Sequence, residues 1–431
     1  MREFFGNRKV LIIGNGISGQ GAGEALAKLG AQVTVADEAA NARIISRKFV
    51  SEFNLIITSP SVAPTHKIYK LAKSLKLEIY GEAELGARLF SGTLIGITGT
   101  NGKTTTVSLL GEILKRAGKN AAVCGNIGVS FAHTAVFTKP DIAVCELSSF
   151  QLEDSITLKP HIAIITNISP DHLDRHGSFN AYAAAKCAIA KNQTKAEYLI
   201  VSQDDIPLYC FKNFRPDSRV LYTSRTGKVH GAYVTDGTVY YDNQPIIAVN
   251  QIRLIGGHNL SNCLFAVCAA KLLEVENSVI AEVLREFEGE KHRVQLIAHQ
   301  NGKNFYNDSK GTNIAASLAA AKAMQGTCAL ILGGKEKGCS FDELFANLPD
   351  NVVYIAAIGE AADTILRSAA ATGYTKKHTV EKKDTLQDAV SACAQTPAQN
   401  VLLSPACASF DMFKDYAARG NAFAEAVANL G

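Results

Sequence analysis

The chain has 431 residues, of which 47% are hydrophobic and 19% charged, and its formal net charge is +4. This length suits about three domains of roughly 150 residues each. The basic residues are dispersed, which argues against nucleic acid as a partner. No apolar stretch approaches the ~20 residues that a membrane-spanning helix needs, so we expect no membrane partner. The first residues lead directly into a predicted strand without a cleavable signal.

Ten cysteines are scattered along the chain, and none forms a Cys-x-x-Cys pair. Most lie in apolar contexts, such as Cys145 after Ala143 and Val144. Buried reduced thiols are therefore the favoured interpretation over disulfides or a metal site. We expect a cytoplasmic protein that acts as a monomer.

The N-terminal segment predicts a small parallel α/β unit, with strands at residues 9–13 and 32–36 around a helix at 21–29. Glycines 14, 16 and 19 match the G-x-G-x-x-G pattern, and Asp37 ends the next strand. Taken alone, this pattern indicates a dinucleotide site of a dehydrogenase. The physics requires only a helix N-terminus near phosphate and an acid that accepts hydrogen bonds. Another nucleotide would therefore serve as well.

The sequence GITGTNGKTTT, from Gly96 to Thr106, follows a short apolar run and precedes a predicted helix. Small residues let backbone N–H groups close on phosphate oxygens at a helix N-terminus. The lysine reaches the terminal phosphates, and the next hydroxyl can ligate Mg²⁺. Ile97 stands where the strict phosphate-loop template has its first glycine. The segment nevertheless predicts a nucleoside triphosphate site.

Three features downstream carry further chemistry. Glu146 ends the predicted strand 141–146, where such folds place a Mg²⁺ ligand, although it can also face solvent. His172 lies in the dense segment DHLDRH with Asp171, Asp174 and His176, and it can ligate a metal, orient a carboxylate or cap a helix.

Lys186 lies on an alanine-rich predicted helix and is either a snorkelling surface residue or buried. Burial would lower its pKa and allow the free amine to form a carbamate with CO₂. The residues alone favour the surface position.

The remaining chain predicts antiparallel hairpins over residues 220–255, helices at 259–273 and 279–287, a hinge at 288–293 and a third α/β unit. In that last unit, the segments 307–313, 333–338 and 402–410 all follow strand-like runs. They could therefore converge at the carboxyl edge of one sheet, where their cations and hydroxyls suit a carboxylate-bearing ligand.

We therefore predict an α/β protein of three domains. Residues 1–91 are expected to form an N-terminal Rossmann-like parallel sheet. Residues 92–290 are expected to form a central P-loop ATPase-type α/β domain with a small antiparallel β subregion. Residues 291–431 are expected to form a C-terminal Rossmann-like α/β domain.

The motifs GTNGKTT, GNIG, ELSSFQL, DHLDRH, GGHNLSN, HR, NDSKGTN, GG-x-x-KG and LLSPACASFD span nearly the whole chain. In this order they resemble the Mur ligase family, the ATP-dependent amino-acid-adding enzymes of peptidoglycan synthesis. ELSSFQL together with SPACASFD resembles the D-glutamate-adding branch. GTNGKTT alone would also suit the folylpolyglutamate synthetases.

The resemblance implies ATP-dependent joining of D-glutamate to UDP-N-acetylmuramoyl-L-alanine through an acyl phosphate, with ATP and two Mg²⁺ ions. It implies catalytic roles for Lys103, Glu146, His172 and Lys186, and metal ligation by Thr104, Glu146, His172 and carbamylated Lys186. The implied ATP contacts are Gly99, Thr100, Asn101, Gly102, Lys103, Thr104, Thr105, Asn259, Arg293 and Asp308. The implied UDP-substrate contacts are Gly16, Ile17, Ser18, Asp37, Asn126 and His172. The implied D-glutamate contacts are Lys310, Thr312, Lys337, Ser409, Phe410 and Tyr416.

Four positions depart from the family pattern. Glu38 replaces a small hydroxyl residue and Ser61 replaces the glycine of a Ser-Pro-Gly turn, both near the uridine contacts. Phe410 replaces an aliphatic residue and Tyr416 replaces a phenylalanine, both in the amino-acid pocket. The alternatives are a folylpolyglutamate-type ligase that does not need residues 1–91, a nicotinamide dehydrogenase, and a non-catalytic ATP-binding switch.

Overall fold

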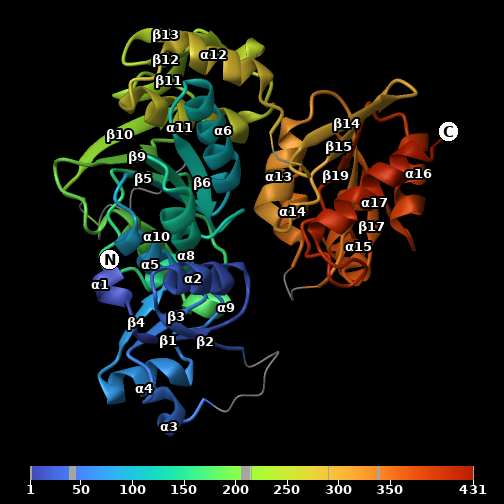
Figure 1. The fold of residues 1–431 in the computed structure, drawn as a ribbon. Coiled ribbons are helices and arrows are strands. Elements are labelled where there is room, and N and C mark those ends of the chain that lie inside the picture. The colour runs from blue at the N-terminus through green and yellow to red at the C-terminus, as the bar shows by residue number, and fades with distance from the viewer. Residues whose placement is uncertain are drawn as a thin grey trace. The chain divides into compact units, whose positions relative to one another are not determined.

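A computed structural model describes residues 2–37, 45–204, 214, 216–289, 291–336 and 340–430. The predicted site residue Lys337 and the departure at Glu38 lie outside these ranges. The chain divides into two compact units, Met1–Arg253 with Ser261–Phe287, and Leu254–Leu260 with Glu288–Gly431. The first unit contains two β-sheets and the second contains one (Figure 1).

The first sheet has the strand order β2-β1-β3-β4 and is parallel throughout. Its inner strands are buried on both faces, which is why they read as continuous apolar runs such as Leu55–Thr58. The elements of this region are α1 (Arg2–Phe5), β1 (Lys9–Ile13), α2 (Ile17–Lys28), β2 (Gln32–Ala36), α3 (Arg47–Val50), β3 (Leu55–Thr58), α4 (Lys67–Leu75), β4 (Glu78–Gly81) and α5 (Glu82–Leu89).

The second sheet has the order β13-β12-β11-β10-β9-β8-β5-β7-β6, with β5 between β8 and β7. Its strands are β5 (Thr93–Thr98), β6 (Ala121–Gly125), β7 (Ile142–Glu146), β8 (Ile162–Ile165), β9 (Tyr198–Ser202), β10 (Arg219–Ser224), β11 (Gly231–Thr235), β12 (Thr238–Tyr241) and β13 (Gln244–Ala248). The helices of this region are α6 (Lys103–Arg116), α7 (Phe131–His133), the π-helix Thr134–Thr138, α8 (Ser149–Glu153), α9 (Leu173–His176), α10 (Phe179–Cys187), the 3₁₀ turns Ala188–Ala190 and Val249–Gln251, α11 (Gly257–Leu272) and α12 (Asn277–Glu286).

The prediction of antiparallel hairpins over residues 220–255 is correct for β11, β12 and β13 and wrong for β10. The turn at Asp236 and Gly237 has positive φ angles of 47° and 68°, which suit a tight hairpin. Strand β10 instead pairs parallel to both β9 and β11. The parallel pairing of β10 with β9 depends on the tertiary fold. The alternation of apolar and polar residues along β10 does not predict it.

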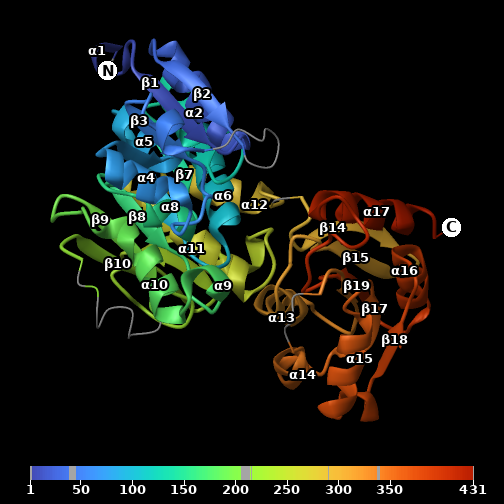
Figure 2. The ribbon, with the colours of Figure 1, turned by 90° about the horizontal axis from the view of Figure 1, so that it is seen from below.

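The third sheet has the order β14-β15-β19-β16-β17-β18 and is parallel except for the edge strand β14. One apolar cluster packs residues of α13, α14 and α15 against the sheet, and another packs residues of α16 and α17, so helices cover both faces (Figure 2). The elements are β14 (Gln295–Gln300), β15 (Lys303–Asn307), α13 (Ile314–Ala323), β16 (Cys328–Gly333), α14 (Asp342–Asn347), β17 (Val352–Ile358), α15 (Ala362–Ala371), the 3₁₀ turn Tyr374–Lys376, β18 (Thr379–Lys382), α16 (Leu386–Gln395), β19 (Asn400–Leu403) and α17 (Tyr416–Ala428).

The protein is thus of mixed α/β class and is built on parallel sheets, as the alternating sequence pattern predicted. Within the described ranges, no helix is both long enough and apolar enough to cross a membrane. As expected, the described cysteines are buried thiols outside disulfides, and they are Cys124, Cys145, Cys187, Cys263, Cys268, Cys328, Cys393 and Cys407. The domain boundaries at residues 91 and 290 stay a prediction.

Candidate active site

The predicted phosphate loop connects the central strand β5 to the N-terminus of α6. Gly99 and Gly102 have φ angles of 143° and 84°, which residues with a Cβ rarely adopt. A Cβ on Gly99 would lie 1.9 Å from Thr166 Oγ1, and one on Gly102 would lie 2.2 Å from Asn262 Oδ1. The loop therefore needs both glycines, for backbone conformation and for close packing.

The segment that follows β8 holds this loop in shape. Asn101 donates its backbone N–H to Asn167 Oδ1 at 3.0 Å, and Asn167 Nδ2 donates to Asn101 O at 2.9 Å. Thr166 Oγ1 donates to the same carbonyl at 2.6 Å. The Thr100 hydroxyl lies 2.9 Å from Tyr182 Oη and accepts from Ser169 N. The loop is thus pre-organised by side chains from neighbouring elements.

Two lysine side chains meet at this loop. Lys103 Nζ donates to Gly99 O at 2.7 Å and to Thr100 O at 2.8 Å. Lys186 Nζ, from α10, donates to the same Gly99 O at 2.7 Å. Lys186 is only 2% exposed, so the expectation from the residues alone that it lies at the surface is wrong. Burial, and secondarily the charge of Lys103, hold the pKa of Lys186 well below its ordinary value.

A buried acid and a hydroxyl form the second part of the site. Thr104 Oγ1 donates to Glu146 Oε2 at 2.8 Å, and Asn126 Nδ2 donates to Glu146 Oε1 at 2.9 Å. Glu146 is 2% exposed, and both of these partners are neutral. A buried carboxylate with neutral partners suits a cation, and hydroxyl and carboxylate oxygens are the ligands that Mg²⁺ prefers.

Within the described ranges, no group of three or more His, Cys, Asp or Glu side chains is arranged to hold a metal ion. The Thr104–Glu146 pair therefore offers two oxygen ligands, and further ligands would have to come from substrate, water or a modified side chain. Thr105 Oγ1 is buried without a hydrogen-bond partner, so the same turn of α6 also has an unused polar group.

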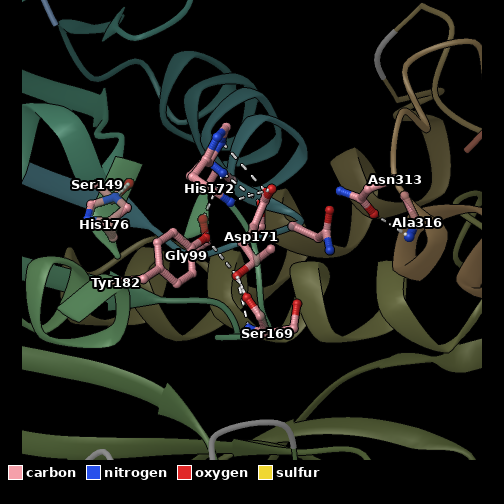
Figure 3. Close-up of polar contacts among 12 residues, drawn as sticks. Gly99, Ser149, Ser169, Asp171, His172, His176, Tyr182, Asn313 and Ala316 are labelled. Atoms are coloured by element: carbon pink, nitrogen blue, oxygen red, sulfur yellow. Dashed lines mark hydrogen bonds and ion pairs between the residues drawn. The ribbon is translucent and has the colours of Figure 1, made fainter. Parts of the chain in front are cut away.

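His172 lies at the start of α9 in a left-handed conformation, with φ of 51°. Its backbone N–H bonds Asp171 Oδ1 at 2.9 Å, and its Nε2 lies 3.7 Å from Asp171 Oδ2 (Figure 3). The ring is half exposed and packs edge-on against Phe150 at 5.0 Å. The proposed pairing of His172 with Lys186 on one metal ion stays a prediction.

The rest of α9 is tied to the first sheet and to α8. His176 Nε2 lies 3.0 Å from Ser149 Oγ (Figure 3). Its Nδ1 lies 2.9 Å from Glu153 Oε1, and burial lowers the pKa of His176. The Arg175 guanidinium lies over the Phe150 ring at 3.9 Å and donates to Pro60 O at 2.9 Å. This network fixes the backbone beside His172 to the turn that follows β3.

The N-terminal glycine turn connects β1 to α2. Gly14 has a φ of 95°, and a Cβ on Gly19 would lie 2.0 Å from Gly14 O, so two of the three glycines are required by geometry. Asn15 donates its backbone N–H to Asp37 Oδ2 at 3.1 Å. Ile17 is 68% exposed and Ser18 is half-buried. The structure thus brings Asp37 to the turn, as predicted for a nucleotide site.

The predicted ATP residues Asn259, Arg293 and Asp308 belong to the other compact unit. Asp308 accepts from Ser404 Oγ at 2.6 Å and from Val294 N at 3.2 Å. Burial raises the pKa of Asp308 to about 6. Arg293 Nε is buried without a hydrogen-bond partner, and Asn259 Nδ2 donates to Ile255 O at 2.9 Å.

The described members of the predicted D-glutamate set follow the carboxyl ends of β15 and β19 in the chain. Lys310 Nζ lies 5.6 Å from the centre of the Tyr416 ring. Phe410 is 70% exposed and Tyr416 is 39% exposed, whereas Ser409 is buried and Thr312 is half-buried. Large exposed aromatic side chains beside a lysine form a surface that a small acidic ligand can contact.

The side chains that shape the phosphate loop were not assigned a role from the sequence, and they are Thr166, Asn167, Tyr182 and Asn262. A signal for the first two existed, because Thr166 and Asn167 directly follow the apolar strand β8 and lie a few positions before the polar segment DHLDRH. Asn262 lies in the segment GGHNLSN, but nothing local indicates that it packs against Gly102.

The fold and the site together define an ATP-type phosphate-binding enzyme of α/β class, with a second nucleotide-type turn on a separate sheet. Residues 97–270 match the model of the Mur ligase middle domain. A UDP-N-acetylmuramoylalanine–D-glutamate ligase of Caldanaerobacter subterraneus subsp. tengcongensis is 38% identical over 445 residues, which cover 98% of each chain. A ligase of the same name from Geobacillus kaustophilus is 38% identical over 450 residues and 99% of each chain. The chain belongs to the Mur ligase family.

Solved structures share this fold at low sequence identity. A UDP-N-acetylmuramate-alanine ligase from Thermotoga maritima aligns with a TM-score of 0.63 at 17% identity, over 99% of this chain and 100% of the other. A pseudomurein peptide ligase type C from Methanothermus fervidus aligns with a TM-score of 0.62 at 18% identity, over the same shares. These likenesses support the fold, whereas the full-length relatives establish the family.

Proposed function

We propose that this protein is an ATP-dependent amide ligase that adds D-glutamate to UDP-N-acetylmuramoyl-L-alanine in peptidoglycan precursor synthesis. The structural observation that carries the proposal is the meeting of Lys103, Lys186 and the Thr104–Glu146 pair at one phosphate loop. The full-length relatives named for this reaction supply the substrates. We also propose that the protein is cytoplasmic and monomeric.

The reaction proceeds by carboxylate activation. The terminal L-alanyl carboxylate attacks the γ-phosphorus of ATP, which forms an acyl phosphate and releases ADP. The amine of D-glutamate attacks the acyl carbon, and the tetrahedral intermediate collapses to the amide with loss of phosphate and a proton. Because every participant is anionic, fixed positive charge is the main catalytic requirement.

Each residue of the central site has a role in that requirement. Lys103 leaves its loop carbonyls to meet the terminal phosphates, and the backbone N–H groups of Gly99–Thr105 hold the phosphate chain. Asn259, Arg293 and Asp308 are also proposed to contact ATP. Arg293 is half-buried, and its buried Nε, which has no hydrogen-bond partner, is a donor for an anion.

Mg²⁺, when bound, would offset the charge of the triphosphate and of the carboxylate that it meets. Thr104 and Glu146 fit one ion through their oxygens. A second ion would be held by His172 and Lys186, provided that Lys186 carries a carbamate, because an ammonium group cannot ligate a metal. The lowered pKa of the buried Lys186 amine favours the neutral form that reacts with CO₂.

We assign the two other substrates to the first sheet and the third sheet. Gly16, Ile17, Ser18 and Asp37 are proposed to hold the uridine part, with Asn126 and His172 nearer the muramoyl end. Lys310, Thr312, Lys337, Ser409, Phe410 and Tyr416 are proposed to hold D-glutamate. This assignment implies three domains: a Rossmann-like domain at residues 1–91, a P-loop domain at 92–290 and a Rossmann-like domain at 291–431.

The direct test incubates the protein with ATP, Mg²⁺ and UDP-N-acetylmuramoyl-L-alanine and measures phosphate release with each amino acid in turn. The proposal predicts release with D-glutamate and little with L-glutamate or neutral amino acids. Release that is indifferent to the amino acid would contradict it and favour an ATP-binding switch. Activity with a folate substrate would favour the folylpolyglutamate-type alternative.

A further inference from the structure

Arg419, in the first turn of α17, is among the largest fully buried side chains of the described residues and is only 1% exposed. A guanidinium has five N–H donors, and here each has an acceptor. Nε donates to Ser309 Oγ at 3.0 Å, and Nη2 donates to Ser309 O at 2.8 Å and Cys407 O at 3.1 Å. Nη1 donates to Ala408 O at 3.3 Å and, more weakly, to Gly333 O at 3.5 Å. Arg419 thereby ties together the chain at the carboxyl ends of β15, β16 and β19.

All of these acceptors are neutral. Among residues 291–336 and 340–430, no carboxylate forms an ion pair with Arg419, and Cys407, Asp411 and Asp308 act on it only through longer-range electrostatics. Burial lowers the pKa of Arg419 to about 10, so the group stays charged at neutral pH. Burying a charge among neutral dipoles alone is costly, and a fold that keeps it retains positive potential at that place.

The packing around the guanidinium is close. Gly334 has a φ of 137°, and a Cβ at this position would lie 2.2 Å from Ala408 O and 3.0 Å from Arg419 Nη1. Ser309 Oγ also donates to Tyr416 O at 2.8 Å, so the same hydroxyl links the loop after β15 to the start of α17. These contacts fix the position of the charge relative to the loops.

The acceptors of Arg419 are sequence neighbours of proposed amino-acid contacts. Ser309 immediately precedes Lys310, and Ala408 immediately precedes Ser409. A buried guanidinium that holds both backbones sets the positions of those two side chains. Its charge also adds positive potential to this unit, in which Phe410 and Tyr416 are exposed.

We propose that Arg419 is a positioning residue for the acidic amino-acid substrate, fixing the loops that carry Lys310 and Ser409 and supplying positive charge that favours an anionic side chain. This inference rests on the proposed function, because the acidic substrate is D-glutamate. Arg419 acts through the loops and does not touch the substrate.

The test compares Arg419→Met, Arg419→Lys and Ser309→Ala with the wild-type enzyme, with phosphate release as the readout for each substrate in turn. Arg419→Met is expected to raise the KM for D-glutamate about tenfold or more, with the KM values for ATP and the UDP substrate within about twofold. Arg419→Lys keeps the charge and should restore part of the loss. Ser309→Ala removes one acceptor and should raise the same KM by a smaller factor.

Arg367→Met is the matched control, because Arg367 is an exposed arginine on α15 of the same unit, and its kinetics should not change. Thermal melting checks that each variant is folded. If Arg419→Met does not fold, Arg419→Lys and Ser309→Ala test the proposal in its place. In these variants, too, the KM for D-glutamate should rise while the KM values for ATP and the UDP substrate stay nearly constant.

An unchanged KM for D-glutamate, or an equal rise for all three substrates, would overturn the proposal. Failure of the proposed function is recognised separately, because wild-type protein would then release no phosphate in response to D-glutamate.

Discussion

The two glycine-rich turns of the first unit have the same strand, turn and helix layout but very different surroundings. At the phosphate loop, a Cβ on Gly99 would overlap Thr166, and side chains from neighbouring segments hold the backbone. At the N-terminal turn, a Cβ on Gly16 would meet nothing within 4 Å, and Ile17 is 68% exposed. Glycine spacing alone does not distinguish the two turns, whereas the side chains around them do. Phosphoryl transfer needs several groups held in fixed positions around the phosphates, and binding a nucleotide for recognition needs fewer such groups.

The largest expected effect, on kcat, is at the phosphate loop, which is the more enclosed of the two turns. Lys186→Arg should lower kcat at least about a hundredfold, because a guanidinium cannot form a carbamate and the charge balance at Gly99 O changes. Binding of the UDP substrate should remain close to wild type. The measurements are steady-state kinetics with and without added bicarbonate, and ¹³C NMR of the carbamate. Lys195→Arg, at an exposed position, is the control. Full activity of Lys186→Arg would contradict the proposal that Lys186 carries a carbamate.

The second prediction compares one glycine from each turn. Gly99→Ala forces a Cβ into a backbone with φ of 143° and should cost about 1–3 kcal/mol or more in unfolding free energy, with loss of phosphate release. Gly16→Ala has a φ of −74° and open space, so its stability should change by less than about 0.5 kcal/mol. Thermal and chemical denaturation measure both. Equal losses in the two variants would show that the turns are equally enclosed.

A smaller effect is expected at the open turn. Asp37 accepts a hydrogen bond from Asn15 N, and its carboxylate is proposed to help hold the uridine part of the substrate. Asp37→Asn keeps the shape, removes the charge and should raise the KM for the UDP substrate by roughly three- to tenfold. The KM for ATP and kcat should stay within about twofold. A matching rise in the KM for ATP would mean that this turn serves the phosphate loop.

The smallest catalytic effect is expected where the two sheets of the first unit join. Glu82 follows β4 and accepts from Ala132 N of α7 at 2.8 Å, and burial raises its pKa to about 7 from 4.5. The folded state therefore binds the proton more tightly than the unfolded state. Protonated Glu82 makes its full contribution to the free energy of unfolding below pH 4.5, and this contribution is lost as pH rises through about 7.

Glu82→Gln should remove this loss, so its stability advantage over wild type should grow with pH to about 3 kcal/mol near pH 8, with kcat unchanged. Urea denaturation of both proteins across this range measures the difference. An advantage that is constant with pH would contradict the assigned proton.

Much of the scaffold followed from the sequence, because its information is local. Buried parallel strands read as apolar runs, and the phosphate loop combines glycines, a lysine and hydroxyls within a few positions. The burial of Lys186 did not follow, because its partner Gly99 O lies 87 positions away and an alanine-rich helix gives no sign of which face is covered. The same holds for Arg419, whose partner Ser309 lies 110 positions away. Contacts between residues far apart in the sequence decide whether a charged side chain is exposed. The local sequence pattern does not specify these contacts.

The most direct test of the account is calorimetric binding of Mg²⁺-ADP and of UDP-N-acetylmuramoyl-L-alanine to wild type, Lys103→Ala and Asp37→Asn. We predict that Lys103→Ala weakens ADP binding at least about tenfold and leaves binding of the UDP substrate unchanged. Asp37→Asn should weaken binding of the UDP substrate by a smaller factor and leave ADP binding unchanged. Loss of both ligands in either folded variant would contradict the central claim that the two glycine turns bind two different nucleotides.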